Sequence, residues 1–220
     1  MGIISYILYF IVFNLLLRHP YILVAAVLLY VFRDRIPNPS VWIRRSQVFS
    51  RLRREVSINP YDSTARRDLG MVLLEKGRPA EALDNFLEAL KKEPNSAEVN
   101  HFTGLAYLRS GKPDEAVKYL GRAVELEPRL KYGESWLYLG EAQIALGKHQ
   151  EALESLKKHL SINNTSIEGL YQYARALNAL GMKDEAKKAV EDGIRYHKGN
   201  PSFRRRRDWR AYVKLKGLKI

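Results

Sequence analysis

The sequence predicts an all-α protein: a superhelical solenoid of about four repeated helix pairs, with flanking helices and an N-terminal apolar membrane segment. Residues 63–200 repeat every 34 positions, and each copy holds two amphipathic stretches whose apolar residues lie three and four apart. A glycine separates the two stretches, at the point where the first helix should end. Because one such helix pair cannot bury its apolar side alone, neighbouring pairs have to stack into a common core.

Residues 1–35 are predicted to be a membrane anchor made of two apolar runs, 3–17 and 21–32. In one interpretation the runs form a helical hairpin that turns at residues 18–20, with arms of about 22 and 18 Å against a hydrocarbon core of about 30 Å. In a second, one tilted helix spans the membrane and places Arg18 near its centre, which costs about 2.5–3.5 kcal/mol. A cleaved secretory signal is the third interpretation, and the absence of Lys and Arg before the first run argues against it.

A dense group of arginines follows the apolar segment and indicates its orientation. Because Lys and Arg accumulate on the cytoplasmic side of membrane segments, we expect a bacterial inner membrane with the repeats on its cytoplasmic face. The basic residues expected close to the membrane are Arg33, Arg35, Arg44, Arg45, Arg51, Arg53, Arg54 and, near the other end of the chain, Arg204, Arg205, Arg206 and Arg207. An import receptor on an organelle's outer membrane would share this plan.

Residues 36–62 are predicted to be a linker followed by a capping helix. The segment 36–39 contains two prolines and should be short and stiff, and Ser40 is placed to cap a helix that runs from Trp42 to about Ser57. We interpret residues 47–58 as an orphan half-repeat that covers the first full repeat. This arrangement would hold the solenoid close to the bilayer.

Four repeats are predicted, at residues 63–96, 97–130, 133–166 and 167–200. Each carries a small residue where its two helices approach closely, and the first two end at a proline that stops the second helix. The third copy begins two residues late. The fourth lacks the proline and has Gly193 where an alanine is expected, which we interpret as a fraying terminal repeat.

This pattern resembles the tetratricopeptide repeat (TPR) family, and the third copy opens with the family's Trp-x2-Leu-Gly motif at residues 136–140. Together with the apolar segment, the resemblance is to a membrane-anchored bacterial TPR protein. It implies a solenoid whose first helices line a concave groove for a protein or peptide partner. The chaperone-tail clamp of the family is not expected, since its asparagines are missing and an acid replaces a base. The matching positions hold Arg67, Met71, Phe102, Glu134 and Tyr138.

The resemblance implies that the second, fifth, ninth and twelfth positions of each repeat face the groove. With two residues at the rim, these positions predict a partner-binding site of Arg67, Met71, His101, Leu105, Arg109, Leu137, Tyr138, Glu141, Tyr171, Arg175 and Asn178. Leu108 and Ile144 occupy groove positions too, with packing against a neighbouring helix as an equal alternative. Four residues have no reason to be buried and are expected to stay accessible: Arg67, His101, Tyr171 and Arg175. An apolar floor with a few opposed charges suits a peptide anchored by one or two apolar side chains.

Composition and motifs predict no enzyme, and therefore no catalytic residue, metal or cofactor. The chain has no cysteine, its five histidines are scattered without metal-ligand spacing, and it contains no phosphate-binding glycine loop. His149 and His159 are expected at the surface. The net charge is +1 over residues 63–198 and +7 over residues 199–220, so the repeats carry no basic stripe and nucleic acid is not an expected partner.

Residues 201–220 are predicted to form a basic C-terminal capping helix. Its apolar residues Phe203, Trp209 and Val213 should cover the exposed end of the fourth repeat. A second contact with anionic lipid or with an acidic partner is the alternative. Both hold if the aromatic residues point inward and the arginines outward.

These features favour a non-enzymatic, membrane-anchored adaptor or scaffold that binds a protein or peptide partner in its groove at the cytoplasmic membrane face. Membrane lipids are the second expected partner. The alternative is a structural subunit of a larger membrane complex, assembled with other subunits through the N-terminal apolar segment and a paired Arg18.

Overall fold

The computed structural model describes residues 39–220 without a gap, with helix alone given for 39–45. Before them it describes only residues 6, 7, 10, 14, 18, 19, 21, 24, 25, 27 and 30. The predicted anchor therefore lies largely outside the described residues, as do Arg33 and Arg35 and the side chains of Arg44 and Arg45. None of the helices described is both long enough and apolar enough to cross a membrane. The chain divides into two compact units, 1–50 and 51–220, and the second holds all of the repeats.

The helix α3 (Pro39–Ile58) precedes the repeats. It begins one residue before Ser40, so the prediction that Ser40 caps this helix is wrong: a proline at the first helical position already has the φ that a helix needs. In the part of α3 that belongs to the second unit, Leu52 is buried and Val56 is half-buried, whereas Arg51, Arg53 and Arg54 are exposed. Whether α3 acts as an orphan half-repeat stays a prediction.

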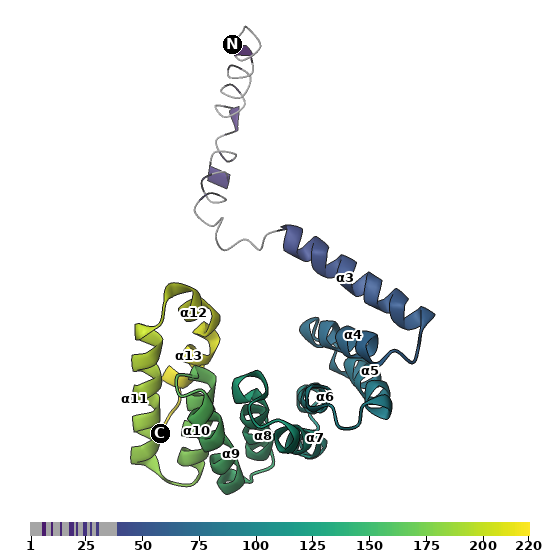
Figure 1. Ribbon diagram of the computed structural model, residues 1–220. Coiled ribbons are helices and arrows are strands. Elements are labelled where there is room, and N and C mark those ends of the chain that lie inside the picture. The colour runs from purple at the N-terminus through teal and green to yellow at the C-terminus, as the bar shows by residue number, and fades with distance from the viewer. Residues whose placement is uncertain are drawn as a thin grey trace. The chain divides into compact units, whose positions relative to one another are not determined.

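Eight helices of the second unit form four antiparallel pairs that follow one another side by side in chain order (Figure 1). Their bounds are α4 (Ser63–Glu75) with α5 (Pro79–Lys92), α6 (Ala97–Arg109) with α7 (Pro113–Leu126), α8 (Glu134–Ala145) with α9 (His149–Ile162), and α10 (Ile167–Ala179) with α11 (Lys183–Gly199). The residues described in this unit contain no strand. The predicted all-α solenoid is confirmed.

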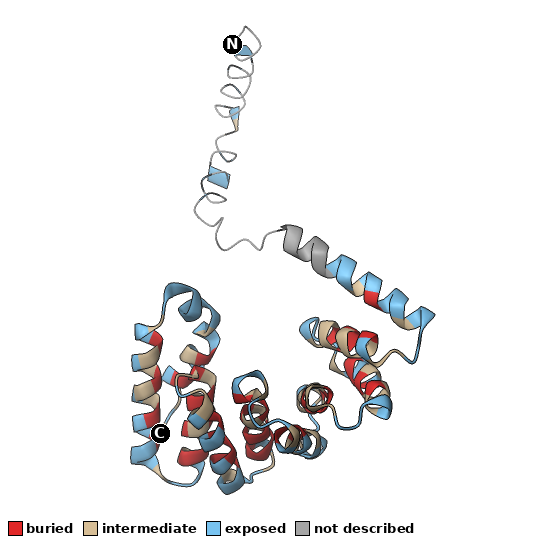
Figure 2. Cartoon of the chain, viewed as in Figure 1, coloured by how far each residue is buried: buried red, intermediate tan, exposed pale blue. Residues whose placement is uncertain are grey.

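Each pair is joined by a turn that a glycine makes possible. Gly77, Gly111, Gly147 and Gly181 have φ between 71° and 78°, a left-handed conformation that side chains with a Cβ rarely adopt. Inside the pairs, small residues let the helices touch: a Cβ added to Gly104 would lie 2.5 Å from the Cγ atom of Leu120. The buried residues accordingly face the neighbouring helices and form clusters that follow one another along the stack (Figure 2).

A short left-handed turn accounts for the late start of the third repeat. In η1 (Leu130–Gly133), Lys131 has φ 48° and Tyr132 has φ 58°, and Gly133 continues the turn with φ 77°. Two of these three residues carry side chains that make this conformation unfavourable, so the turn is a strained insertion between repeats two and three. It also replaces the usual cap, because α8 begins after Gly133, which has no side chain to accept a hydrogen bond.

The C-terminal residues cap the last repeat, but not with the predicted face. They form two helices, α12 (Ser202–Arg207) and α13 (Trp209–Lys216), which meet at Asp208. Because of this break, the apolar residues of the two helices do not share one stripe. Phe203, Trp209 and Val213 are 68%, 56% and 50% exposed, so the prediction that they cover the repeat is wrong.

Instead, α13 packs on α10 and α11 through Leu215, which is fully buried, and through Tyr212, whose ring stacks on His197 at 4.0 Å between centroids. Gly193 of α11 explains the choice of Leu215. A Cβ on Gly193 would collide with Cδ2 of Leu215, so the absence of a side chain at Gly193 leaves the space that Leu215 fills. The interpretation of Gly193 as a sign of fraying is therefore wrong, and α11 continues to Gly199.

Candidate functional site

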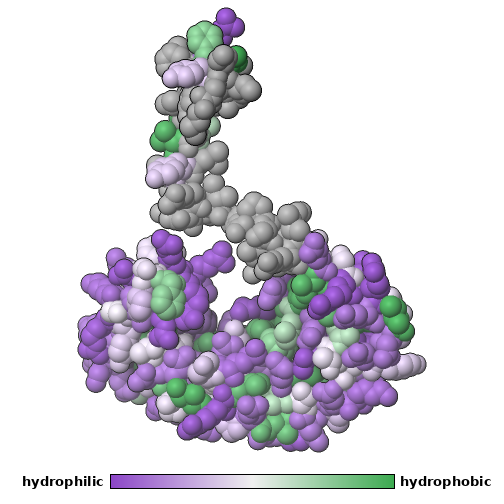
Figure 3. Space-filling model, turned by 45° about the horizontal axis from the view of Figure 1, so that its top comes forward, coloured by the Kyte–Doolittle hydropathy of each residue, from purple (hydrophilic) through white to green (hydrophobic). Residues whose placement is uncertain are grey.

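The concave side of the repeats is where the sequence predicts a partner. In the space-filling view the unit is hollowed between its two ends, and hydrophobic side chains show inside the hollow among hydrophilic ones (Figure 3). Met71 and Leu105, two of the predicted groove residues, are half-buried, which leaves part of each apolar side chain open to contact. Arg67 is held by two carboxylates, with Nη2 2.8 Å from Oδ1 of Asp68 and Nη1 3.3 Å from Oε2 of Glu98.

The second and third repeats bring three predicted groove residues together. Arg109, at the end of α6, has Nη1 3.5 Å from Oε1 of Glu141 on α8, and its guanidinium lies 5.9 Å from the ring centre of Tyr138. Burial raises the pKa of Tyr138 to about 12, so its hydroxyl keeps its proton. Burial also raises the pKa of Glu141, against the opposing effect of Arg109. Tyr138 and Glu141 are half-buried and Arg109 is exposed, and the three side chains form a polar contact shared by successive repeats.

His101 is not a groove residue, contrary to the prediction. It is 1% exposed, and its Nδ1 lies 2.8 Å from Oγ of Ser135 in the next repeat. Burial and the nearby charge of Lys131 lower the pKa of His101 to about 4, so the imidazole is neutral at physiological pH. Its role is to join α6 to α8.

The apolar groove candidates are mostly packed into the core. Leu137 is 5% exposed and Ile144 is 9% exposed, both within the cluster that joins the third and fourth repeats. Leu108 is half-buried against a neighbouring cluster. For Ile144 and Leu108, packing is thus the better description, and Leu137 offers little surface to a partner.

In the fourth repeat, the capping segment reaches the predicted groove residues. Nζ of Lys214 lies 5.6 Å from the ring centre of Tyr171, and Nδ2 of Asn178 donates to the carbonyl oxygen of Lys219 at 3.0 Å. Arg175 donates to Oε1 of Gln172 at 2.7 Å and lies over the same tyrosine ring, 5.7 Å from its centre. The chain itself therefore occupies much of this end of the groove.

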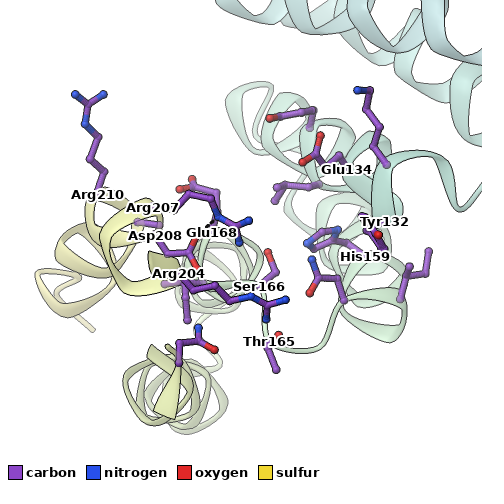
Figure 4. Close-up of a pocket in the computed structure, with 18 residues that line it drawn as sticks. Tyr132, Glu134, His159, Thr165, Ser166, Glu168, Arg204, Arg207, Asp208 and Arg210 are labelled. Atoms are coloured by element: carbon purple, nitrogen blue, oxygen red, sulfur yellow. Dashed lines mark hydrogen bonds and ion pairs between the residues drawn. The ribbon is translucent and has the colours of Figure 1, made fainter. Parts of the chain in front are cut away.

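A cavity of about 690 Å³ opens between the third repeat and the cap (Figure 4). Its walls come from η1, the start of α8, the loop between α9 and α10, and the helices α12 and α13. The charged residues of the lining are Lys131, Glu134, Glu168, Arg204, Arg207, Asp208 and Arg210. Figure 4 shows Arg204 reaching toward Ser166 and Thr165, whereas the guanidinium of Arg210 points away.

The charges in this cavity are only partly paired. Nε of Arg207 donates to Oδ1 of Asp208 at 2.9 Å, and this pairing raises the pKa of Arg207. Burial raises the pKa of Glu134, against the effects of Lys131 and Arg207. Arg204 has no ion pair with any residue that the structure describes.

His159 forms part of the cavity wall and is not at the surface as predicted. It is 1% exposed, its Nδ1 donates to the carbonyl oxygen of Gly133 at 2.9 Å, and its ring packs against Gly169. Burial lowers its pKa, so the ring is neutral and ties the strained turn to α9. Among the described residues, no three His, Asp or Glu side chains gather in a way that suits a metal ion.

The sequence associates Arg204 and Arg207 with a membrane surface and gives no direct sign that they lie beside the third repeat. The residues of the cavity come from three regions far apart in the chain. One signal is visible in the sequence, the two-residue shift before the third repeat, because an insertion between repeats often marks a functional loop.

Comparison with known proteins agrees with the observed fold. A tetratricopeptide repeat family model matches residues 47–98 and 103–167, and a second tetratricopeptide repeat model matches residues 143–205. The DnaJ homolog subfamily C member 7 homolog of Schizosaccharomyces pombe is 26% identical over 161 residues, which are 67% of this chain and 34% of that protein. Hsp70-Hsp90 organizing protein 1 of Glycine max is 22% identical over 152 residues, 64% of this chain and 26% of that protein. The chain thus spans about a third or less of the length of these two relatives.

Solved structures give the same architecture. A crystal structure of MamA superposes with a TM-score of 0.64 at 20% identity, covering 72% of this chain and 86% of that one. YrrB, described as a TPR protein with an unusual peptide-binding site, superposes with a TM-score of 0.63 at 19% identity, covering 81% of this chain and 87% of that one. At these identities the likeness concerns the fold.

Proposed function

Because the chain belongs to the tetratricopeptide repeat family, we propose that it is a non-enzymatic adaptor that binds a protein or peptide partner in the concave groove of its repeats. The observation that carries the proposal is the contact of the exposed Arg109 with the half-buried Tyr138 and Glu141. It places opposed charges and an aromatic ring across two successive repeats, which is the kind of polar and aromatic surface that anchors a polypeptide.

The names of related proteins support a binding role. The relative in Glycine max is named for organising two other proteins, and YrrB is described by its peptide-binding site. The partner of this chain need not resemble theirs, because the positions that match a chaperone-tail clamp include Glu134 and Met71. We therefore expect a partner other than a chaperone tail.

The proposal includes attachment to a membrane, and its support comes from the sequence. Residues 1–35 contain two apolar runs, and seven arginines with only two opposing acids follow within residues 33–55. Such a bias favours the cytoplasmic face of a bacterial inner membrane for the repeats. Lipids are then the second partner of the chain.

The test is quantitative affinity purification of the full chain from detergent-solubilised membranes. The groove variant carries Arg67→Glu and Arg109→Glu, both at partly exposed side chains, and the matched control is Lys157→Glu, an exposed base on α9. We expect the groove variant to lose its partner while staying in the membrane fraction, and the control to keep both. Equal recovery of the same proteins by all three chains would refute groove binding.

A structural subunit of a membrane complex would behave differently in the same experiment. Assembly would then survive the groove variant and fail when Arg18 is replaced. Release of the unmodified full chain as a freely soluble protein, without detergent, would refute the membrane part of the proposal.

A further inference from the structure

The cavity beside the cap has the size of a binding site. Its volume of about 690 Å³ lies within the range of about 300–1,000 Å³ that is typical of pockets for ligands. It lies at the beginnings of α8 and α10, both of which direct the positive end of a helix dipole toward it. Helix beginnings alone do not make a site, so the side chains decide what this one accepts.

Cationic side chains from two parts of the chain line this cavity. They are Lys131, whose Nζ also lies 4.9 Å from the ring centre of Phe102, and Arg204 and Arg207, whereas the guanidinium of Arg210 points away (Figure 4). Lys214 does not line the cavity, but its Nζ lies 3.8 Å from Oε1 of Glu168. The three carboxylates of the lining are not equally available. Asp208 is paired with Arg207. Glu168 is paired with Lys214 and also accepts a hydrogen bond of 3.0 Å from Gln172. Glu134 is partly desolvated.

Only two of the four consecutive arginines of α12 line the cavity. Arg204 and Arg207 are three positions apart and therefore share one helix face, and both line the cavity. Arg205 and Arg206 do not line it, although all four arginines are exposed to solvent. A diffuse electrostatic role would use all four alike, whereas a ligand inside the cavity would contact Arg204 and Arg207.

A strained turn at the cavity supplies an aromatic contact. Tyr132 lines the cavity next to Lys131 and is 79% exposed. Its backbone is left-handed, with φ 58°. Strained backbone persists where the surrounding structure requires it and is concentrated at binding sites. An exposed ring beside cationic groups suits a polypeptide better than it suits a small inorganic anion.

We propose that this cavity receives an acidic segment of the partner polypeptide, whose carboxylates are held by Arg204, Arg207 and Lys131. The inference rests on the proposed adaptor function and names the chemistry of what is bound. It differs from a clamp built on the first helices of the repeats, since its cations come from the inter-repeat insertion and from the cap.

The test measures fluorescence anisotropy of the full chain in detergent with a labelled peptide Ser-Glu-Leu-Asp-Glu-Phe-Glu-Ser, against the same peptide with Gln and Asn in place of its acids. The variant Arg204→Gln/Arg207→Gln is compared with Arg205→Gln/Arg206→Gln, which removes the same charge from the same helix. We expect the acidic peptide to bind more tightly than the neutral one. The first variant should weaken it about tenfold or more, because two charge-assisted contacts are lost, and the second by less than about threefold.

A third variant, Glu134→Gln, should strengthen binding of the acidic peptide, because it removes a carboxylate that competes for the same cations. Equal binding of the acidic and neutral peptides would overturn the inference, as would equal losses in the two double variants. Vesicles of phosphatidylserine and phosphatidylcholine provide the second arm. If they displace the peptide and both double variants lose vesicle binding alike, the arginines serve a lipid surface and the inference falls.

Failure here is separable from failure of the adaptor function. Partner capture that depends on Arg67 and Arg109, with no preference for the acidic peptide, leaves the adaptor proposal intact and refutes the acidic segment. Loss of both refutes the two proposals together.

Discussion

The packing of Leu215 against the backbone of Gly193 can be tested by a double-mutant cycle between these two residues. Leu215 is fully buried against the bare backbone of α11, so Leu215→Ala should destabilise the fold by about 2–5 kcal/mol. Gly193→Ala places a methyl group where Cδ2 of Leu215 lies, and such overpacking costs about 1–3 kcal/mol. The gain in helix propensity offsets up to about 1 kcal/mol of that cost.

The two changes should not add. Once Leu215 is truncated, the methyl group of Gly193→Ala has space, and only the gain in helix propensity is left. The same substitution should therefore change from destabilising to stabilising, with a coupling energy of about 1–3 kcal/mol between the two sites. Gly121, in the interior of α7, is the matched control, since a Cβ there meets nothing within 4 Å. Gly121→Ala should stabilise by about 0.5–1 kcal/mol in either background.

The assay is urea unfolding of the full chain in detergent, followed by circular dichroism. Hydrogen exchange of α13 accompanies it, because stacked repeats can lose their end before the rest. An effect of Gly193→Ala that is the same with Leu215 and with alanine at position 215 would refute the packing described for the cap. So would rapid exchange of α13 in the unmodified chain.

Three further predictions concern single residues. Acidification from pH 6.5 to about 4 should destabilise the fold by up to about 3 kcal/mol through His101, because in this range the unfolded state binds a proton on the imidazole and the folded state does not. His101→Gln should therefore reduce the dependence of the urea midpoint on pH. An unchanged dependence would contradict the assignment. Tyr132→Gly should stabilise by about 1 kcal/mol in thermal unfolding, since glycine accepts the left-handed backbone, and a loss of stability would mean that the turn is not strained. Trp209→Ala should destabilise the fold by less than Leu215→Ala, because Trp209 is 56% exposed and Leu215 is fully buried; an equal or larger loss would restore the predicted inward face.

The repeat pattern predicts the helices because its signals are local. The glycine turns and the proline stops act within a few residues, so their positions in the sequence translate directly into helix ends. The left-handed glycines, such as Gly111, follow from spacing alone. Interactions within one copy can thus be predicted from the order of its residues.

Contacts between copies are less predictable. The groove positions include His101, but its partner Ser135 lies beyond the inserted turn, which shifts the register between the second and third repeats. Groove positions that are counted from the start of each repeat do not take that shift into account. The prediction for the cap is wrong for a similar reason. Which side of the cap is buried depends on the space at Gly193 and on the helix break at Asp208, and the pattern of hydrophobic residues in the sequence indicates neither.

The measurement closest to the central claim is site-specific photo-crosslinking in intact cells. A photoreactive amino acid replaces Met71, a predicted groove residue, in one chain and Lys157 on α9 in another. A polypeptide crosslinked from position 71 and recovered with the membrane fraction, with none from position 157, is the result expected of a membrane-held adaptor. Crosslinks from position 157 alone, or an equal yield from both, would contradict it.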